Sequence, residues 1–286
     1  MLKEKIGFIG AGGMGEALIK SIIDKKLLPL QNIWVCDKVK KKLYLLAKSG
    51  VRITTSIKET VKEVDIIVLA VKPGDIKLVL RELKEEVNPS QLIISIAAGV
   101  SIYCLTKLLN KNIPIVRVMP NTPICVGEGM CVFTPGPGVK KDKIKVTRQI
   151  LKAVGKVEEL PEDKQNAVTG LSGSGPAYIY TVIEGLIKGG IKVGLSRKIA
   201  YNLAIQTTLG AAKLAKKSNL SLEDLLSAVV SPKGTTAEGL KVLKERELKD
   251  CIAQAVIKST ERANQISTEM ESNLEDHSLP NTRKKI

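Results

Sequence analysis

The chain has 286 residues, of which 44% are hydrophobic and 26% are charged, a balance that excludes disorder over most of its length. Lysine and arginine outnumber aspartate and glutamate by 45 to 29, and the resulting net charge of +16 indicates an anionic partner. Aromatic residues make up only 3% of the chain, so a platform for stacking unpaired bases is poorly supplied, and a small anionic ligand fits at least as well.

Five cysteines, with no C-x-x-C pair among them, indicate neither a disulfide framework nor a zinc site. We therefore expect a reducing compartment and no bound metal. The opening sequence MLKEKIGFIG is too poor in apolar residues for a signal peptide, and no stretch offers the roughly 20 apolar residues of a spanning helix. The chain is expected to be soluble and cytoplasmic, with no membrane partner.

The first half alternates short β-branched runs with amphipathic stretches. Strands are predicted at residues 5–9, 32–36, 51–54, 65–71, 92–96 and 115–118, and helices at 15–25, 39–48, 57–63, 75–86 and 102–109. Runs such as VDIIVLAV are apolar on both faces, as in a parallel sheet covered by helices on both sides. The pattern predicts an α/β fold with an N-terminal Rossmann-like, doubly wound parallel sheet.

The second half changes to long segments with a period near 3.6, which predicts an all-α domain. Helices are predicted at residues 176–193, 196–217, 222–230, 236–245 and 248–265, with Ser196 and Ser221 as helix-capping serines. From Ser267 onward the sequence is polar and loses its period. We expect a Rossmann domain over residues 1–160, a helical substrate and dimerisation domain over 161–268, and a flexible tail over 269–286.

The segment IGFIGAGGMGEAL places Gly10, Gly12 and Gly15 in a G-x-G-x-x-G pattern directly after a strand and directly before a helix. The first glycine makes the tight turn, the second lets a pyrophosphate approach the backbone, and the third lets the helix pack on the strand. The helix N-terminus then offers free N–H groups to the phosphates. This combination predicts dinucleotide binding.

The end of the second strand indicates two opposite cofactor preferences. Asp37 lies 22 residues after Gly15, about where a carboxylate binds the ribose hydroxyls of NAD. Lys38, with further lysines after it, can instead accept the 2′-phosphate of NADP, although such a run is often only a solvated helix start. NADPH and NADH therefore both remain possible cofactors.

Further loops follow later strands or precede later helices. Residues 70–73 and 97–99 follow strands, where open α/β sheets place ligands, although each could be only a structural turn. Residues 170–178 and 231–236 offer hydroxyls and N–H groups at helix starts, an arrangement that suits either a small carboxylate or ordinary capping. The only histidine, His277, lies in the expected tail, so the chain lacks the histidine and carboxylate pair of a hydroxy-acid dehydrogenase.

Taken together, these segments resemble the pyrroline-5-carboxylate reductase family from about Ile6 to Gln265. The resemblance rests on an ordered set of motifs: FIGAGGMG, LAVKP (69–73), SIAAGV (95–100), RVMPNTP (117–123), TGLSGSGPAY (169–178), GGIKVGLSR (189–197) and SPKGTTAEGL (231–240). It implies reduction of 1-pyrroline-5-carboxylate to L-proline, the last step of proline biosynthesis, with NADPH or NADH. It also implies a homodimer or larger oligomer, in which the active site lies between the nucleotide domain of one subunit and helices of its partner.

The resemblance also assigns site residues. The cofactor would contact Ile9, Gly10, Ala11, Gly12, Gly13, Met14 and Gly15 through its phosphates, and Ala70, Val71, Lys72, Pro73, Ala97, Ala98, Gly99 and Asn121 through its nicotinamide half. The substrate would be held by Ser231, by the N–H groups of Gly234 and Thr235, and by Glu162, with the catalytic Thr236 hydroxyl near the ring nitrogen. A protonated imine already carries its proton, so orientation supplies most of the catalysis.

Several positions depart from the family pattern. Lys233 stands where glycine is usual, so the loop must avoid a positive φ, or a cation has been placed beside the substrate carboxylate. Ile57 replaces a cofactor-contacting asparagine, Asn166 replaces a common aspartate, and Asp37 tilts the expectation slightly toward NADH.

Parts of the sequence are compatible with two other functions. A β-hydroxyacid-dehydrogenase-like oxidoreductase would need a G-x-x-x-K-x-x-N pattern on the first long helix of the second domain, but four residues after Gly185 stands Gly189. A dehydrogenase-like NAD(P)-sensing protein could bind nucleic acid through its basic half, but no helix-turn-helix, zinc or aromatic signature supports this. The sequence therefore favours an enzyme with a small imino-acid substrate and no nucleic-acid partner.

Overall fold

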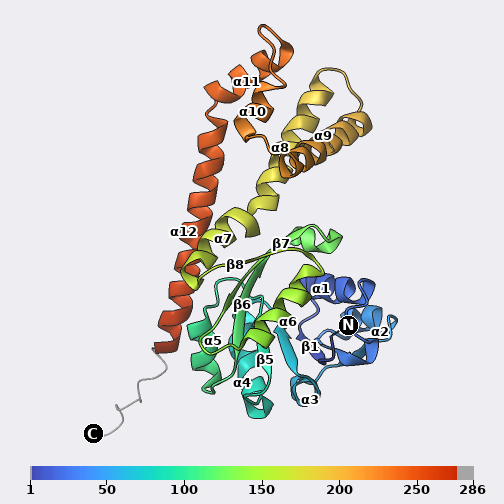
Figure 1. Ribbon diagram of the computed structural model, residues 1–286, viewed down its shortest axis with the longest axis vertical. Coiled ribbons are helices and arrows are strands. Elements are labelled where there is room, and N and C mark those ends of the chain that lie inside the picture. Colours follow the sequence, from blue (N-terminus) through green and yellow to red (C-terminus); the bar gives the residue numbers. More distant parts are fainter. Residues whose placement is uncertain (1, 276–286) are drawn as a thin grey trace, which may run out of the picture. The chain divides into compact units, whose positions relative to one another are not determined.

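A computed structural model describes residues 2–275 of the chain and is shown as a ribbon in Figure 1. Its eight-stranded sheet has the order β3-β2-β1-β4-β5-β6-β7-β8. The strands are β1 (Ile6–Ile9), β2 (Ile33–Cys36), β3 (Arg52–Thr54), β4 (Ile66–Leu69), β5 (Leu92–Ser95), β6 (Ile115–Pro120), β7 (Gly129–Pro135) and β8 (Gly155–Glu159). Among the described strands, β6 and β7 form the one antiparallel pair, and β8 pairs with β7 in parallel, so β7 and β8 run opposite to the other six. The predicted Rossmann-like α/β class is confirmed, with a sheet that is mostly parallel.

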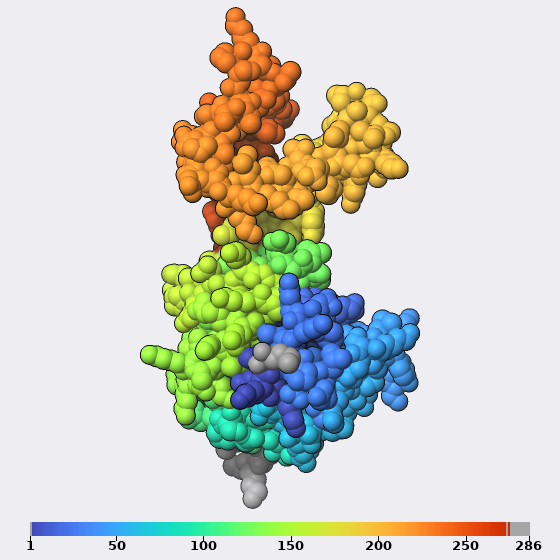
Figure 2. Space-filling view, turned by 45° about the vertical axis from the view of Figure 1, so that its right-hand side comes forward, coloured from blue at the N-terminus to red at the C-terminus, as the bar shows by residue number. Residues whose placement is uncertain are grey.

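Helices cover both faces of this sheet. They are α1 (Gly13–Asp24), α2 (Lys40–Ala47), α3 (Ile57–Glu63), α4 (Ile76–Glu86), α5 (Ile102–Leu109) and α6 (Lys141–Lys152). Alternate strand residues face opposite sides, so Phe8 packs with the core under α1, α2 and α6, while Ile9 packs with the core under α3, α4 and α5. On the face shown in Figure 2, residues of α6 (yellow-green) lie beside N-terminal residues (blue), as their shared core requires.

The segment β7-α6-β8 was not among the predicted elements. Strand β8 is only partly buried and carries Lys156, Glu158 and Glu159, so it lacks the apolar run by which the inner strands are recognised. It lies at the edge of the sheet, where one long side of a strand is unpaired and polar side chains are usual.

The helical part of the chain contains α7 (Gln165–Val168), α8 (Gly175–Lys192), α9 (Arg197–Lys217), α10 (Leu222–Ser227), α11 (Thr235–Glu245) and α12 (Leu248–Glu275). Short 3-10 segments lie at Leu30–Asn32, Pro73–Asp75, Thr122–Val126 and Glu162–Lys164, and a π-helical turn lies at Thr169–Gly173. Ser196 and Ser221 cap α9 and α10 as predicted, the latter in a capping box with Asp224. None of the described helices is long and apolar enough to cross a membrane.

The described residues form two compact units, and their division differs from the expected boundary at 160. Residues 2–174 belong with 258–275, and Gly175–Ile257 forms the other unit. Residues 161–174 belong to the first unit because hydrogen bonds join them to the sheet and to the loop after β6. Gln165 Nε2 donates to Thr134 Oγ1 in β7 at 2.9 Å, and the Ser172 carbonyl oxygen accepts a hydrogen bond from Asn121 Nδ2 at 3.2 Å.

Helix α12 also continues beyond the expected helix end at Gln265, as far as Glu275. Met270 and Leu274 pack against the core under α3, α4 and α5, and Ser101 Oγ donates to Glu271 Oε1 at 2.7 Å. These tertiary contacts stabilise a polar sequence that has little helical period of its own. The rest of the expected tail, with His277, lies outside the described residues.

We predict that Met270→Ala lowers the free energy of unfolding by about 1–2 kcal/mol, because a partly buried apolar contact is lost. Ser272→Ala, on the exposed side of the same turn of helix, is the matched control and should leave the unfolding midpoint unchanged. Urea unfolding followed by circular dichroism measures both variants. Equal midpoints would show that the end of α12 contributes nothing to the fold.

Candidate functional site

The turn after β1 and the first turn of α1 each contain a glycine at which there is no room for a side chain. Gly10 has a φ of +102°, and a Cβ atom there would lie 2.6 Å from the carbonyl oxygen of Ala70. A Cβ atom on Gly15 would lie 2.5 Å from the carbonyl oxygen of Gly10. Both distances are far below van der Waals contact, so the chain itself requires these two glycines.

Gly12 differs, because a Cβ atom there would have no neighbour within 4 Å and its φ of −73° suits any residue. It is the N-cap of α1, and no side chain caps that helix end. The first N–H groups of a twelve-residue helix are therefore left for another partner beside an open backbone surface. This cradle fits the pyrophosphate of a dinucleotide, which was the predicted role of Gly12.

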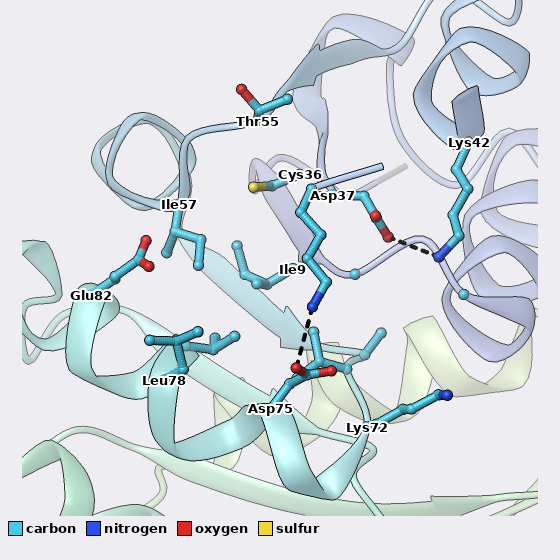
Figure 3. A pocket seen from close by; sticks show the side chains of 16 residues that line it. Ile9, Cys36, Asp37, Lys42, Thr55, Ile57, Lys72, Asp75, Leu78 and Glu82 are labelled. Atoms are coloured by element: carbon cyan, nitrogen blue, oxygen red, sulfur yellow. Dashed lines mark hydrogen bonds and ion pairs between the residues drawn. The ribbon is translucent and has the colours of Figure 1, made fainter. Parts of the chain in front are cut away.

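A cavity of about 390 Å³ opens beside this turn, at the carboxyl ends of β1, β2 and β4 (Figure 3). This is the point where the strand order reverses and where open α/β sheets bind ligands. Its walls combine expected cofactor residues with others from β2, α2, the loop before α3, α3 itself, the 3-10 turn after β4, and α4. The lining residues are Ile9, Gly10, Gly12, Cys36, Asp37, Lys38, Lys42, Thr55, Ile57, Ala70, Val71, Lys72, Asp75, Leu78, Val79 and Glu82.

Asp37 uses its carboxylate within the protein. Its Oδ2 accepts hydrogen bonds from Ala11 N at 2.8 Å and Lys42 Nζ at 3.4 Å, while its Oδ1 accepts one from Val39 N at 2.8 Å. Burial alone would raise the pKa of this carboxyl, but the two N–H groups and the lysine hold its pKa below the usual value. Asp37 thus ties the end of β2 to the glycine turn, a role that the sequence prediction did not include.

The Lys38 side chain pairs with a different carboxylate, that of Asp75. Its Nζ lies 3.3 Å from Asp75 Oδ1, and its side chain is 80% exposed. Figure 3 shows this ion pair as the dashed line that ends on Asp75, while the labelled Lys72 ammonium points away from it. The structure therefore brings together the predicted residues Asp37 and Lys38 with Lys42 and Asp75, which were not predicted as site residues.

The remaining expected cofactor residues lie outside the cavity wall. Pro73 begins a 3-10 turn, and Ala11 and Met14 pack in or against the core below α1. Gly99 has a φ of +74°, and a Cβ atom there would lie 2.7 Å from Ile266 Cγ2, so contact with α12 already explains this glycine. The set outside the wall is Ala11, Gly13, Met14, Gly15, Pro73, Ala97, Ala98, Gly99 and Asn121.

Asn121 is engaged inside the protein. Its Oδ1 accepts a hydrogen bond from Met130 N at 2.8 Å, and its Nδ2 donates to the Ser172 carbonyl oxygen at 3.2 Å. The methyl group of Met119 fills the space beside Gly173, where a Cβ atom would lie 2.5 Å from it. The MPNTP segment therefore holds the π-helical turn that precedes α8.

Glu162 is the ion-pair partner of a buried arginine. Arg117 in β6 is 4% exposed, and its guanidinium binds Glu162 Oε1 at 3.2 Å and Asn166 Oδ1 at 3.1 Å. The same Glu162 oxygen accepts a hydrogen bond from Ile102 N at the start of α5, at 2.7 Å. An arginine inside the apolar run IVRVMP was the available signal, because a buried cation requires an anionic partner.

The expected substrate loop belongs to the second unit. Thr235 and Thr236 begin α11, and no side chain caps this helix at its N-cap Gly234. Of the two predicted N–H donors, that of Gly234 binds the Ser231 carbonyl oxygen at 3.0 Å. Lys233 has a φ of +59°, so the expectation that the loop avoids a positive φ was wrong, and lysine occupies the left-handed conformation usually left to glycine. Gly234 follows so closely on Ser231 that a Cβ atom would collide with its Oγ.

Comparison with known proteins connects both units to one family. Residues 162–266 match the family model described as pyrroline-5-carboxylate reductase dimerisation, and residues 5–99 match NADP oxidoreductase, coenzyme F420-dependent. A pyrroline-5-carboxylate reductase of Methanosarcina acetivorans is 41% identical over 267 residues, which cover 93% of this chain and 99% of the relative.

Two solved structures agree in fold and sequence. The pyrroline carboxylate reductase of Plasmodium falciparum, with NADP bound, and a pyrroline-5-carboxylate reductase of Coxiella burnetii each superpose with a TM-score of 0.86. Both are 35% identical to this chain, covering 93% of it and 99% of the solved chain. This chain therefore belongs to the pyrroline-5-carboxylate reductase family, the homo-oligomeric oxidoreductases that reduce pyrroline-5-carboxylate to proline with a nicotinamide cofactor.

Proposed function

We propose that the cavity holds the cofactor with its pyrophosphate over Gly12 and the N-terminus of α1, and with its adenosine ribose beside Asp37 and Lys38. The observation that carries this proposal is the open, uncapped backbone at Gly12, between two glycines that the fold requires. Once bound, the reduced nicotinamide supplies the hydride that adds to the imine carbon.

The proposed substrate site is the start of α11. The Thr235 N–H at this helix N-terminus suits the substrate carboxylate, because a helix N-terminus favours an anion. The Gly234 N–H, which donates to the Ser231 carbonyl oxygen at 3.0 Å, is the proposed second donor to that carboxylate. The Thr236 hydroxyl would then bind the ring nitrogen and orient the protonated imine for attack. A positioning role of this kind requires no general acid, since the imine enters with its proton. Glu162 stays a proposed substrate contact, although its carboxylate also binds Arg117.

The proposed setting is a cytoplasmic dimer or larger assembly that needs neither nucleic acid nor a membrane. The five cysteines are free, as suits a reducing compartment. Exposed apolar side chains on α8 and α9, including Leu186, Tyr201 and Leu203, offer a surface for a second copy. Part of the excess positive charge of the chain lies in lysines on the cavity wall, where it would attract an anionic cofactor.

The first test follows oxidation of NADH and NADPH by absorbance, with and without racemic pyrroline-5-carboxylate. We expect imine-dependent oxidation that proline inhibits, and no oxidation with the control substrate methylmalonate semialdehyde, the aldehyde whose reduction gives 3-hydroxyisobutyrate. Cofactor binding without imine turnover would contradict the proposed substrate site.

A second test separates the glycines. Gly12→Ala adds a methyl group to open space, so we expect an unchanged unfolding midpoint and cofactor binding weakened at least about tenfold. Gly15→Ala forces a methyl group against the Gly10 carbonyl, so the free energy of unfolding should fall by about 1–3 kcal/mol. Thermal unfolding and cofactor titration measure both effects. Normal cofactor affinity in Gly12→Ala would place the pyrophosphate elsewhere.

A third test concerns Thr236. We expect Thr236→Ala to lower kcat at least about tenfold, because the imine is less well oriented, while the dissociation constant of the cofactor stays within about twofold. Thr236→Ser keeps the hydroxyl and should restore most of kcat. Equal losses of turnover and cofactor affinity in the alanine variant would count against a role at the ring nitrogen.

A further inference from the structure

The wall of the cavity carries charges of both signs. Three lysines and three carboxylates line its wall: Asp37, Lys38, Lys42, Lys72, Asp75 and Glu82. Two ion pairs join four of them, Lys42 with Asp37 and Lys38 with Asp75. The two pairs differ in burial and in the other hydrogen bonds that their carboxylates accept. This difference determines which ion pair a bound cofactor can break.

The Asp37–Lys42 pair has a buried carboxylate that is held by further hydrogen bonds. The Asp37 side chain is 7% exposed, and two backbone N–H groups besides Lys42 donate to its two oxygens. Turning this carboxylate toward a ribose would leave buried N–H groups without partners, at a cost of about 1–3 kcal/mol each. Without turning, Asp37 offers ribose hydroxyls only the acceptor sites that its three donors leave free, so it is a poorer acceptor for NADH than its position in the chain indicates.

The Lys38–Asp75 pair is exposed to solvent. Its two side chains are 80% and 39% exposed, and the Nζ–Oδ1 distance is 3.3 Å. Exposed pairs of this kind contribute little, typically about 0–1 kcal/mol, so Lys38 can exchange this partner for a stronger anion. Lys38 is the second residue after the end of β2, where the ribose 2′ substituent of a dinucleotide lies. Asp75 ends the 3-10 turn after β4, on a different wall of the cavity.

We propose that Asp75 is a specificity-determining residue that limits the preference of this chain for NADPH over NADH by holding the Lys38 ammonium. The inference rests on the proposed cofactor site. A 2′-phosphate carries more negative charge than a carboxylate and has three acceptor oxygens, so it draws Lys38 away from Asp75. Part of the binding free energy of NADPH is spent on that exchange and on repulsion from Asp75, whereas NADH leaves the ion pair intact.

The test measures dissociation constants for NADPH and NADH on the full chain without imine, by the fluorescence of the reduced nicotinamide. We expect Asp75→Asn to tighten NADPH binding about three- to tenfold and NADH binding less than about twofold. Lys38→Gln should weaken NADPH binding about tenfold and leave NADH within about twofold. In the Lys38→Gln background, Asp75→Asn should lose most of its effect on the NADPH to NADH ratio, because there is no longer an ammonium to release.

Glu82→Gln is the matched control. Glu82 lies on the same wall, and its substitution removes one negative charge from the cavity without releasing Lys38. If Glu82→Gln and Asp75→Asn shift the ratio of the NADPH and NADH dissociation constants equally, the proposal is overturned. The total charge of the cavity would then explain the cofactor preference. An undiminished Asp75→Asn effect in the Lys38→Gln background would overturn it as well.

The cofactor-binding measurements test the role of Asp75 independently of the proposed substrate site. Cofactor binding with the expected ratios but without imine-dependent oxidation would uphold the role of Asp75 and reject the proposed substrate site. Failure to bind either cofactor would reject the proposed cofactor site and this inference together.

Discussion

The cavity depends on the close backbone approach at the turn between β1 and α1. Gly10 and Gly15 bring the carbonyl oxygen of one against the Cα of the other, and the next strand, β4, contributes the Ala70 carbonyl to the same crowded point. Helix α1 can begin this near the sheet only because both positions lack a Cβ atom. Its N-terminus consequently lies beside the carboxyl ends of β1 and β4, where the strand order reverses and the cavity opens.

A second constraint fixes the neighbouring wall. The Asp37 carboxylate binds the N–H of Ala11 inside the turn and the N–H of Val39 just after β2, so it joins two loops that the backbone ladder does not pair. The strands below it are buried on both faces and cannot shift register without exposing apolar side chains. The cavity is thus built on a rigid base, and its movable charges are the exposed lysines around it.

The Rossmann half could be predicted because its signals are local. Apolar runs such as IIVL are buried on both faces, and glycine spacing follows from backbone geometry alone. The segment β7-α6-β8 and the end of α12 could not, because edge pairing and distant contacts such as Ser101 with Glu271 stabilise them. The same limit applies at Lys233, whose positive φ is imposed by its loop against the residue's own preference. The substrate loop lies in the other compact unit, and its role remains a prediction.

Asp37 shows why a residue type at the right spacing does not determine its chemistry. A carboxylate at the end of β2 can accept hydrogen bonds from ribose hydroxyls or from the chain's own N–H groups, and sequence spacing is identical in the two cases. The choice depends on where the Ala11 and Val39 N–H groups point, which is a property of the folded turn. With the carboxylate bound to these donors, the proposed discrimination between cofactors falls to the more exposed charges, Lys38 and Asp75. Under that proposal, exposed side chains set the cofactor preference and can change without disturbing the buried turn below them.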